Sequence, residues 1–170
     1  MGLDMYLYRD SYVGNNFRVQ MNEMYANEPD KQKPLLTVSG CLLDGLSGKP
    51  LGIQAERIST IREVVAYWRK ANQIHKWFVD HVQDGVDECQ YANVSREQLG
   101  ELVEECKLAL AGRKMGLKPE DILPTQSGCF FGSTDYDEGY WEDLELTISQ
   151  LEKILAFEGD QAEYYYHASW

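Results

Sequence analysis

The sequence has no apolar stretch near the length of a membrane span, and no basic start followed by an apolar run. A bilayer crossing needs about 20 consecutive apolar residues, and a secretory signal needs an apolar core behind a charged start. The residues after Gly2 do not fit N-myristoylation either, because Tyr6 stands where that motif has Ser or Thr. We therefore expect a soluble cytosolic protein without a membrane partner.

Motifs for common chemistries are also missing. The chain contains no nucleophile elbow, Walker A loop, dinucleotide fingerprint or zincin motif. Its four cysteines (Cys41, Cys89, Cys106, Cys129) form no CxxC pair and have no histidine at metal-ligand spacing. We expect no cofactor and no metal, buried cysteines that act as small hydrophobes, and a binding protein rather than an enzyme.

Cations are scarce: 16 Lys and Arg stand against 28 Asp and Glu, a formal net charge of −12. Binding to nucleic-acid backbones depends on many lysines and arginines, so a general nucleic-acid binder is excluded. The charge is uneven, since residues 53–82 hold five cations and three anions, and residues 134–170 hold ten anions and one cation. The acidic end is either a solvated surface or a surface for a basic partner.

What the chain does contain is globular. It has 170 residues, 44% of them hydrophobic, which suits one domain spanning residues 1–170. Alternating or β-rich patterns predict strands, which are expected at residues 3–9, 17–24, 35–42, 129–133 and 162–170. A glycine-rich connector is expected at residues 44–52.

Helical signals follow the first strands. Ser95 and Gln98 form a capping box before an apolar stripe, and Gly112 lies just past the expected end of that helix. A last long helix is expected to start at Asp137 or Glu138. Residues 59–82 have a helical apolar period, although 59–68 also suit a strand. The pattern predicts an α+β fold, a mainly antiparallel sheet packed with about three helices.

The segment YWRKANQIHKWF (67–78) holds most of the candidate site residues. On a helical wheel His75 falls on the apolar side with Asn72 on its flank. The two are either a catalytic pair or, for His75, a core histidine bonded to a tyrosine or a backbone carbonyl. Trp77 points outward, so it either contacts a partner or packs under another part of the fold. The cations beside it on this outward side are Arg69, Lys70 and Lys76.

A second candidate segment, GSTDYDEG (132–139), precedes the last helix. Asp135, Asp137 and Glu138 place carboxylates at the positive end of that helix, where they cap it and repel phosphate. The calcium-loop pattern fails, because Gly139 stands where an oxygen ligand belongs. These three acids are candidates for a binding surface and not for a metal site.

Four segments together (MGLDMYLYR, VAYWRKANQIHKWFV, FFGSTDYDEGYWEDL and YYYHASW) resemble a family of small uncharacterised proteins of bacteriophages and prophages. The resemblance implies an accessory protein of a mobile element in the bacterial cytoplasm, and it carries no catalytic residues. Interference with host or defence proteins is a common occupation of such proteins, and the step from family to function is by association.

The leading hypothesis is therefore a non-enzymatic binding protein that inhibits a host or defence protein through its acidic surface, the Trp77 region, or both. The alternative is a nucleotide-binding protein that sequesters or cleaves a signalling nucleotide, with a Trp or Tyr ring on the base and Arg69, Lys70 or Lys76 on phosphate. A hydrolase centred on His75 and Asn72 is a third hypothesis, and it lacks a nucleophile.

Overall fold

A computed structural model describes residues 2–12, 46–53, 58–157 and 161–170 of the chain. The chain divides into two compact units, one formed by Met1–Asp10 with Arg62–Trp170 and one by Ser11–Ile61. The strands expected at 17–24 and 35–42 lie outside the described residues, as does Cys41. The extent of one domain over residues 1–170 stays a prediction.

In the second unit, the described residues 46–53 contain no helix, and Leu46 and Ser47 form a turn. Gly48 has φ +65°, and the backbone N–H of Lys49 donates to the Ser47 hydroxyl over 3.3 Å. These features confirm the described part of the predicted connector.

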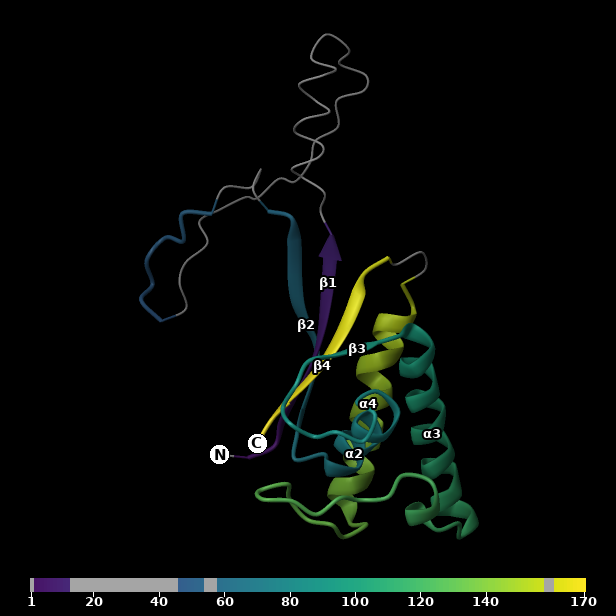
Figure 1. The fold of residues 1–170 in the computed structure, drawn as a ribbon. Helices are drawn as coiled ribbons and strands as arrows, with labels where there is room; N and C mark the ends of the chain where they lie inside the picture. Colours follow the sequence, from purple (N-terminus) through teal and green to yellow (C-terminus); the bar gives the residue numbers. More distant parts are fainter. Residues whose placement is uncertain (1, 13–45, 54–57, 158–160) are drawn as a thin grey trace. The chain divides into compact units, whose positions relative to one another are not determined.

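Four strands of the described residues form one antiparallel sheet in the order β2-β1-β4-β3 (Figure 1). They are β1 (Asp4–Tyr12), β2 (Thr60–Arg69), β3 (Ala92–Val94) and β4 (Glu163–Ser169). In β1 and β4, Leu7 faces Tyr166 and Asp4 faces Ser169. The first and last predicted strands are thus confirmed, and they pair with each other at the centre of the sheet.

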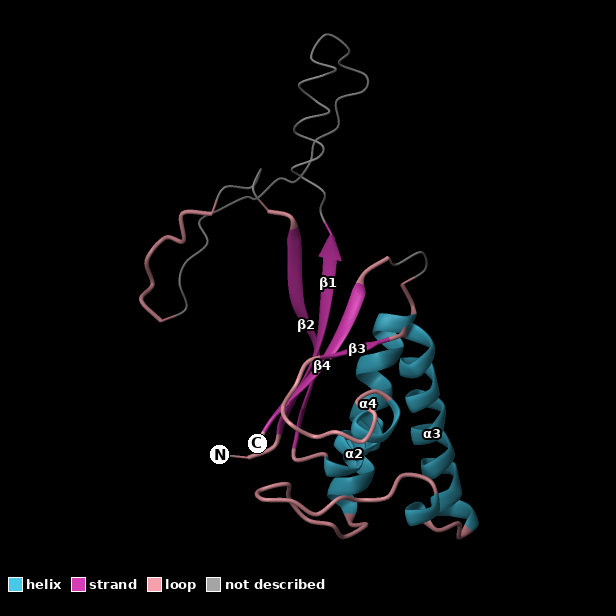
Figure 2. Ribbon diagram, in the orientation of Figure 1, coloured by secondary structure: helices cyan, strands magenta, loops and turns pink. Residues whose placement is uncertain are grey.

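Three α-helices of the described residues lie on one side of this sheet (Figure 2). They are α2 (Asn72–His81), α3 (Arg96–Met115) and α4 (Glu138–Leu155), with a short 3₁₀ helix η3 (Pro119–Asp121). The core between the layers contains Leu3 just before β1, Met5 and Leu7 from β1, and the fully buried Tyr166 ring from β4. This architecture confirms the predicted α+β class.

The starts of α3 and α4 follow the predicted caps. Ser95 accepts from the backbone N–H of Gln98, whose side chain accepts from the backbone N–H of Ser95. The predicted end of α3 at Gly112 is wrong: the helix continues to Met115, and Gly116, with φ +73°, is its C-cap, because the left-handed conformation that ends a helix occurs there. Asp137 caps α4 as predicted.

Residues 59–82 are divided between a strand and a helix, so a continuous helix is the wrong alternative. Ile61, Val64 and Val65 are β-branched and lie in β2, beside β1. Lys70, with φ +61°, breaks the strand before α2 begins. A helical wheel that runs from residue 64 to residue 82 therefore treats strand residues as part of the helix.

Two smaller predictions are also wrong. Residues 129–133 form a turn and a loop and not a buried strand, because Phe130 takes φ +64° and is 60% exposed. The cysteines are not all buried: Cys106 is buried, Cys89 is half-buried and Cys129 is exposed. Burial strongly raises the pKa of the Cys106 thiol, so it behaves as a small hydrophobe.

Candidate functional site

The two candidate segments of the sequence meet at one cleft of about 370 Å³, which we call the charged cleft. Arg69 and Lys70, from the end of β2 and the link to α2, form one part of its lining. The loop before α4 and the first turns of α4 supply its acids, which are Asp135, Asp137, Glu142 and Asp143. Hydroxyls of Thr125 and Ser133 complete the polar lining.

Asn72 holds one wall of the charged cleft in place. Its Nδ2 donates to the backbone carbonyl of Ser133 over 2.7 Å and to that of Phe131 over 3.3 Å, and its Oδ1 accepts from the backbone N–H of Gln126 over 3.0 Å. The side chain is only 1% exposed. Asn72 therefore fixes the loop before α4 and does not bond to His75, which contradicts the predicted pair.

The two walls of the charged cleft come into close contact at Lys70 and Gly132. Lys70 donates its N–H to the Leu3 carbonyl over 2.8 Å. Opposite it, Gly132 has φ +97°, and a Cβ there would lie 3.1 Å from Lys70 Cβ and 3.2 Å from Lys70 O. Only glycine fits this position without displacing Lys70.

The cleft brings opposite charges together without pairing them. Arg69 and Lys70 form no ion pair within the described part of the chain. Asp143 accepts from Nε2 of the buried Gln73 over 3.0 Å. Burial, opposed by that hydrogen bond and assisted by Glu142 and Asp137, raises the pKa of Asp143 to about 6.

His75 is a core histidine, as the structural alternative predicted. It is completely buried; its Nδ1 lies 2.7 Å from the Tyr166 hydroxyl and its Nε2 lies 2.9 Å from Asp87 Oδ2. Asp87 Oδ1 accepts from the indole N–H of Trp170 over 3.1 Å. This network ties α2 to β4 and the C-terminal residue, and its buried imidazole has no access to a substrate.

Of the two alternatives for Trp77, packing under another part of the fold is confirmed and an exposed contact with a partner is wrong. The ring is 3% exposed, stacks on His81 at 4.7 Å and lies beside Glu105 of α3 and the segment 122–124. Nearly every face of α2 is covered, so a wheel with one polar side does not describe it.

Lys76 and Glu138 lie outside the lining of the charged cleft. Lys76 pairs with Asp80 one helical turn away over 2.7 Å, and Glu138 pairs with Arg113 over 2.9 Å. Of the predicted binding residues, the cleft therefore joins Arg69, Lys70, Asp135 and Asp137. No sequence pattern marks Asp143 and Gln73 as site residues, because they differ from other polar helix residues only through their burial.

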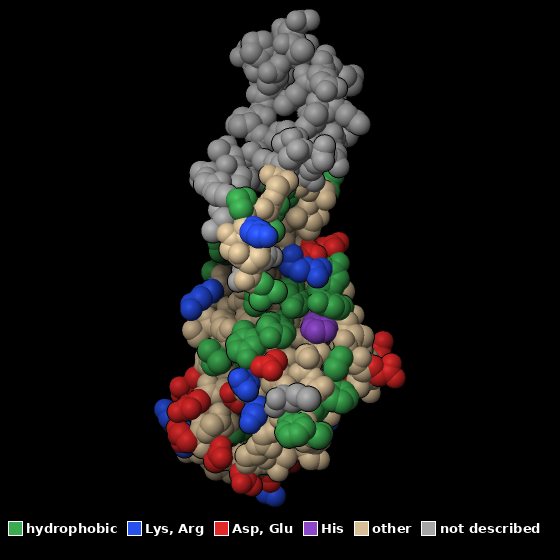
Figure 3. Space-filling view, turned by 90° about the vertical axis from the view of Figure 1, so that its left-hand side faces the viewer, with side chains coloured by type: hydrophobic (Ala, Val, Ile, Leu, Met, Phe, Trp, Pro, Cys, Tyr) green, Lys and Arg blue, Asp and Glu red, His purple; other side chains and the backbone are tan. Residues whose placement is uncertain are grey.

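The sheet face opposite the helices carries a second surface, which we call the tyrosine face. Its members are Tyr6, Tyr8, Arg62, Tyr67, Tyr91, Tyr165 and His167. Tyr6 lies 5.9 Å from Tyr8 and 5.2 Å from Tyr67, measured between ring centroids. Figure 3, viewed from the sheet side, shows hydrophobic side chains gathered there. Tyr6 and Tyr8 at alternate positions of β1 were the sequence signal for this face, whereas in β4 the run of three tyrosines places only Tyr165 on it.

Arg62 organises the tyrosine face. Its guanidinium forms two hydrogen bonds of 2.7 Å to the Asp10 carboxylate. It also lies 5.3 Å from the Tyr8 ring centroid and 5.5 Å from that of Tyr91. The bidentate pair holds the pKa of Asp10 below its usual range, and it fixes the rings before any partner binds.

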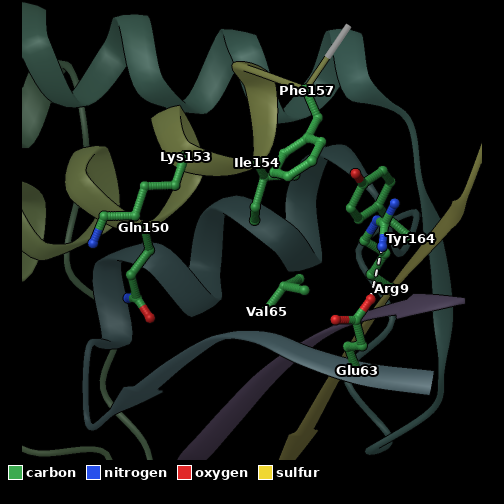
Figure 4. Close-up of a pocket in the computed structure, with 8 residues that line it drawn as sticks. All are labelled: Arg9, Glu63, Val65, Gln150, Lys153, Ile154, Phe157 and Tyr164. Atoms are coloured by element: carbon green, nitrogen blue, oxygen red, sulfur yellow. Dashed lines mark hydrogen bonds and ion pairs between the residues drawn. The ribbon is translucent and has the colours of Figure 1, made fainter. Parts of the chain in front are cut away.

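A third feature is a mostly apolar pocket of about 420 Å³ between the sheet and α4. Val65, Ile154 and Phe157 surround it, and an ion pair of 2.7 Å between Arg9 and Glu63 bounds it (Figure 4). Gln150 lies on its α4 side and bonds through its amide to both backbone groups of Tyr67. That amide takes the place of a neighbouring strand at the edge of β2.

The described ranges contain neither a metal-binding cluster nor a helix that could span a membrane. No cluster of His, Cys, Asp and Glu there has the geometry to hold a metal ion. None of the described helices combines the length and the apolarity that crossing a bilayer requires.

Comparison with known proteins finds no matching family model, no matching curated protein and no matching solved structure. The resemblance to phage and prophage proteins therefore stays a prediction, and the functional argument rests on the surfaces of the chain itself.

Proposed function

We propose that this chain is a non-enzymatic binding protein that engages a protein partner through the tyrosine face. The observation that carries the proposal is the set of tyrosine rings and one arginine on the sheet face that the helices leave uncovered. Tyrosine and arginine are enriched at the energetic centres of protein interfaces, because they supply contact area and hydrogen bonds at low entropic cost.

Besides their composition, the fixed positions of the side chains on the tyrosine face support a role in binding. Arg62 is held by Asp10, and Tyr67 donates its hydroxyl to Asp4 over 2.5 Å. Side chains that are already fixed lose little conformational entropy on association, so more of the contact energy appears as affinity. The face is therefore suited to a rigid partner surface.

The charge of the chain indicates the chemistry of the partner. A net charge of −12 favours a surface with basic groups around an apolar or aromatic centre. The resemblance to phage and prophage proteins directs the search to host and defence proteins of bacteria, with inhibition as the consequence of binding.

A signalling nucleotide is the less favoured ligand. Stacking on the tyrosine rings suits a base, and Arg69 and Lys70, which follow Tyr67 closely in the chain, are the cations for phosphate in this alternative. Four carboxylates share the charged cleft with those cations, and they repel phosphate.

The test is affinity capture from bacterial lysate with the wild type and a Tyr8→Ala/Tyr91→Ala variant. The double variant is expected to lose the partner, and each captured protein is then titrated in purified form. Truncating hot-spot rings costs about 2 kcal/mol or more, which is at least about 30-fold in the dissociation constant.

Leu108→Ala is the control, because Leu108 is 53% exposed on α3 and belongs to neither surface. Circular dichroism checks that all three proteins are folded. Retention of the same partners by the tyrosine variant, at unchanged affinity, would rule out the tyrosine face as the binding surface.

A further inference from the structure

The charged cleft contains both signs of charge in one cavity, and these charges do not neutralise each other. Arg69 and Lys70 form no ion pair in the described ranges, and the carboxylates of Asp135 and Glu142 accept no hydrogen bond from those residues. Opposite charges that line one cavity without contact leave room for a molecule that contacts both.

The balance of charge selects the ligand class. The cleft holds two cations and four carboxylates, which gives a net charge of −2 when all are ionised. A complementary ligand needs one carboxylate for Arg69 and Lys70, and it needs more positive than negative charge for the acids. A basic amino acid has this pattern, with one carboxylate, an α-ammonium group and a side-chain cation.

The dimensions agree with a ligand of that size. A volume of about 370 Å³ lies at the small end of ligand pockets, which begin at about 300 Å³. Nucleic acids and folded domains do not enter such a space, whereas a single amino acid does.

The walls are built before a ligand arrives. Buried Gln73 orients the Asp143 carboxylate, and buried Asn72 holds the loop that carries Ser133. Fixed ligand-binding groups avoid the entropic cost of ordering them during binding.

We propose that the charged cleft binds a free basic amino acid of the arginine type. The α-carboxylate lies against Arg69 and Lys70, and the guanidinium lies against the acids of α4, with Asp143 as its central partner. The raised pKa of Asp143 supports this arrangement, because a partly desolvated carboxylate gains most from a cation placed beside it. The site is separate from the tyrosine face, and the proposal does not depend on protein partner binding.

The test is calorimetric titration of the full chain with three probes at neutral pH and low salt. The probes are L-arginine, agmatine, which lacks the carboxylate, and L-norleucine, which lacks the side-chain cation. L-arginine is expected to bind saturably with a dissociation constant below about 1 mM, and about tenfold or more tightly than either analogue.

Two variants assign the contacts. Arg69→Gln is expected to remove the preference for L-arginine over agmatine, and Asp143→Asn to weaken both ligands about tenfold. Lys76→Gln and Glu145→Gln are the matched controls, since they remove the same charges outside the cleft lining and are expected to change nothing.

Backbone amide shifts of the wild type give an independent readout. L-arginine is expected to move the signals of Gly132, Ser133 and Asp143. Three results would each overturn the proposal: no saturable binding of L-arginine, equal affinity for all three probes, or equal losses in the cleft and control variants.

Discussion

Three buried polar residues of α2, Asn72, Gln73 and His75, each bond to a different part of the fold. Asn72 holds the loop before α4, Gln73 orients Asp143 on α4, and His75 joins Tyr166 of β4 to Asp87. Buried polar groups form hydrogen bonds, and the bonds of these three residues connect α2 to the segments around it. Two of the three connections shape the charged cleft.

Replacing Asn72 tests this structural role. Asn72→Ala removes three hydrogen bonds to loop backbone groups, and we expect the free energy of unfolding to fall by about 2–3 kcal/mol. Urea denaturation measures the change. Glu101→Ala, at an exposed position on α3, is the control and should change stability by less than about 0.5 kcal/mol. Equal effects of the two variants would contradict the role.

Asp143 gives a prediction about pH. Its pKa rises from 3.8 to about 6 in the folded protein, so the folded state binds the proton more tightly than the unfolded state, and the wild type loses stability as the pH rises between these values. Asp143→Asn should therefore raise the free energy of unfolding at pH 7, by about 1 kcal/mol after allowance for solvent screening.

The gain in the free energy of unfolding from Asp143→Asn should vanish below pH 3.8, where Asp143 is protonated in both the folded and the unfolded state. Urea denaturation on either side of this interval checks both the sign and the window. A gain of equal size at acid pH would show that the carboxylate charge is not its cause.

At the scale of elements, the break between β2 and α2 decides the shape of the cleft. Lys70 takes a left-handed conformation there, and Gly132 of the opposite loop lies against it. The two unusual backbone conformations face each other, so each restricts the space available to the other. Residues with such conformations persist where the surrounding structure holds them, and they are frequent at functional sites.

Gly132→Ala tests this contact between elements. The added methyl group would lie 3.1 Å from Lys70 Cβ, at a position with φ +97°, and we expect a loss of about 2 kcal/mol in the free energy of unfolding. Gly100→Ala in α3 is the matched control with the opposite sign. Beyond its chain neighbours and the backbone of its own helix, no atom lies within 4 Å of a Cβ added at Gly100, so alanine should stabilise the helix by up to about 1 kcal/mol. Thermal unfolding of both variants checks the prediction, and a stable Gly132→Ala protein would contradict it.

At the scale of the whole molecule, the tyrosine face and the net charge of the chain contribute to partner binding in different ways. The tyrosine face offers rings and a fixed arginine, whereas the chain as a whole has an acidic charge of −12. Long-range charge governs how fast a partner arrives, and close ring contacts govern how long it stays. Binding kinetics can therefore separate the two contributions.

Salt should act mainly on the association rate with a basic protein partner. Between about 50 mM and about 500 mM salt we expect that rate to fall about tenfold, because the Debye length shrinks from more than 10 Å to less than 5 Å. The Tyr8→Ala/Tyr91→Ala variant should instead raise the dissociation rate at every salt concentration. Surface plasmon resonance measures both rates, and a salt-independent association rate would contradict the charge argument.

Parts of this architecture followed from the sequence. The capping box at Ser95, the cap at Asp137 and the alternation in the first and last strands each depend on residues a few positions apart. Such local signals need no knowledge of the rest of the chain. The α+β class followed from their order.

Other parts required the three-dimensional structure. A helical wheel placed Trp77 on the outward side of α2 and left open whether a partner or the fold covers it; the ring is buried beside Glu105 of α3 and the segment 122–124. Asn72 and His75 are three positions apart and were paired on that basis, but their side chains bond in different directions. Arg69 and Asp143 stand 74 positions apart, and no local pattern connects them.

The sequence by itself determined the class of fold, the starts of the long helices and the acidic charge, because periodicity, N-caps and composition are properties of neighbouring residues or of their sum. Only the tertiary structure decided which charged residues share a cleft and which tyrosines share a face, because those relations depend on how distant segments pack. In this protein β1 and β4 pair across nearly the whole length of the chain. The sequence therefore gave candidates for binding, and packing selected among them and added Asp143.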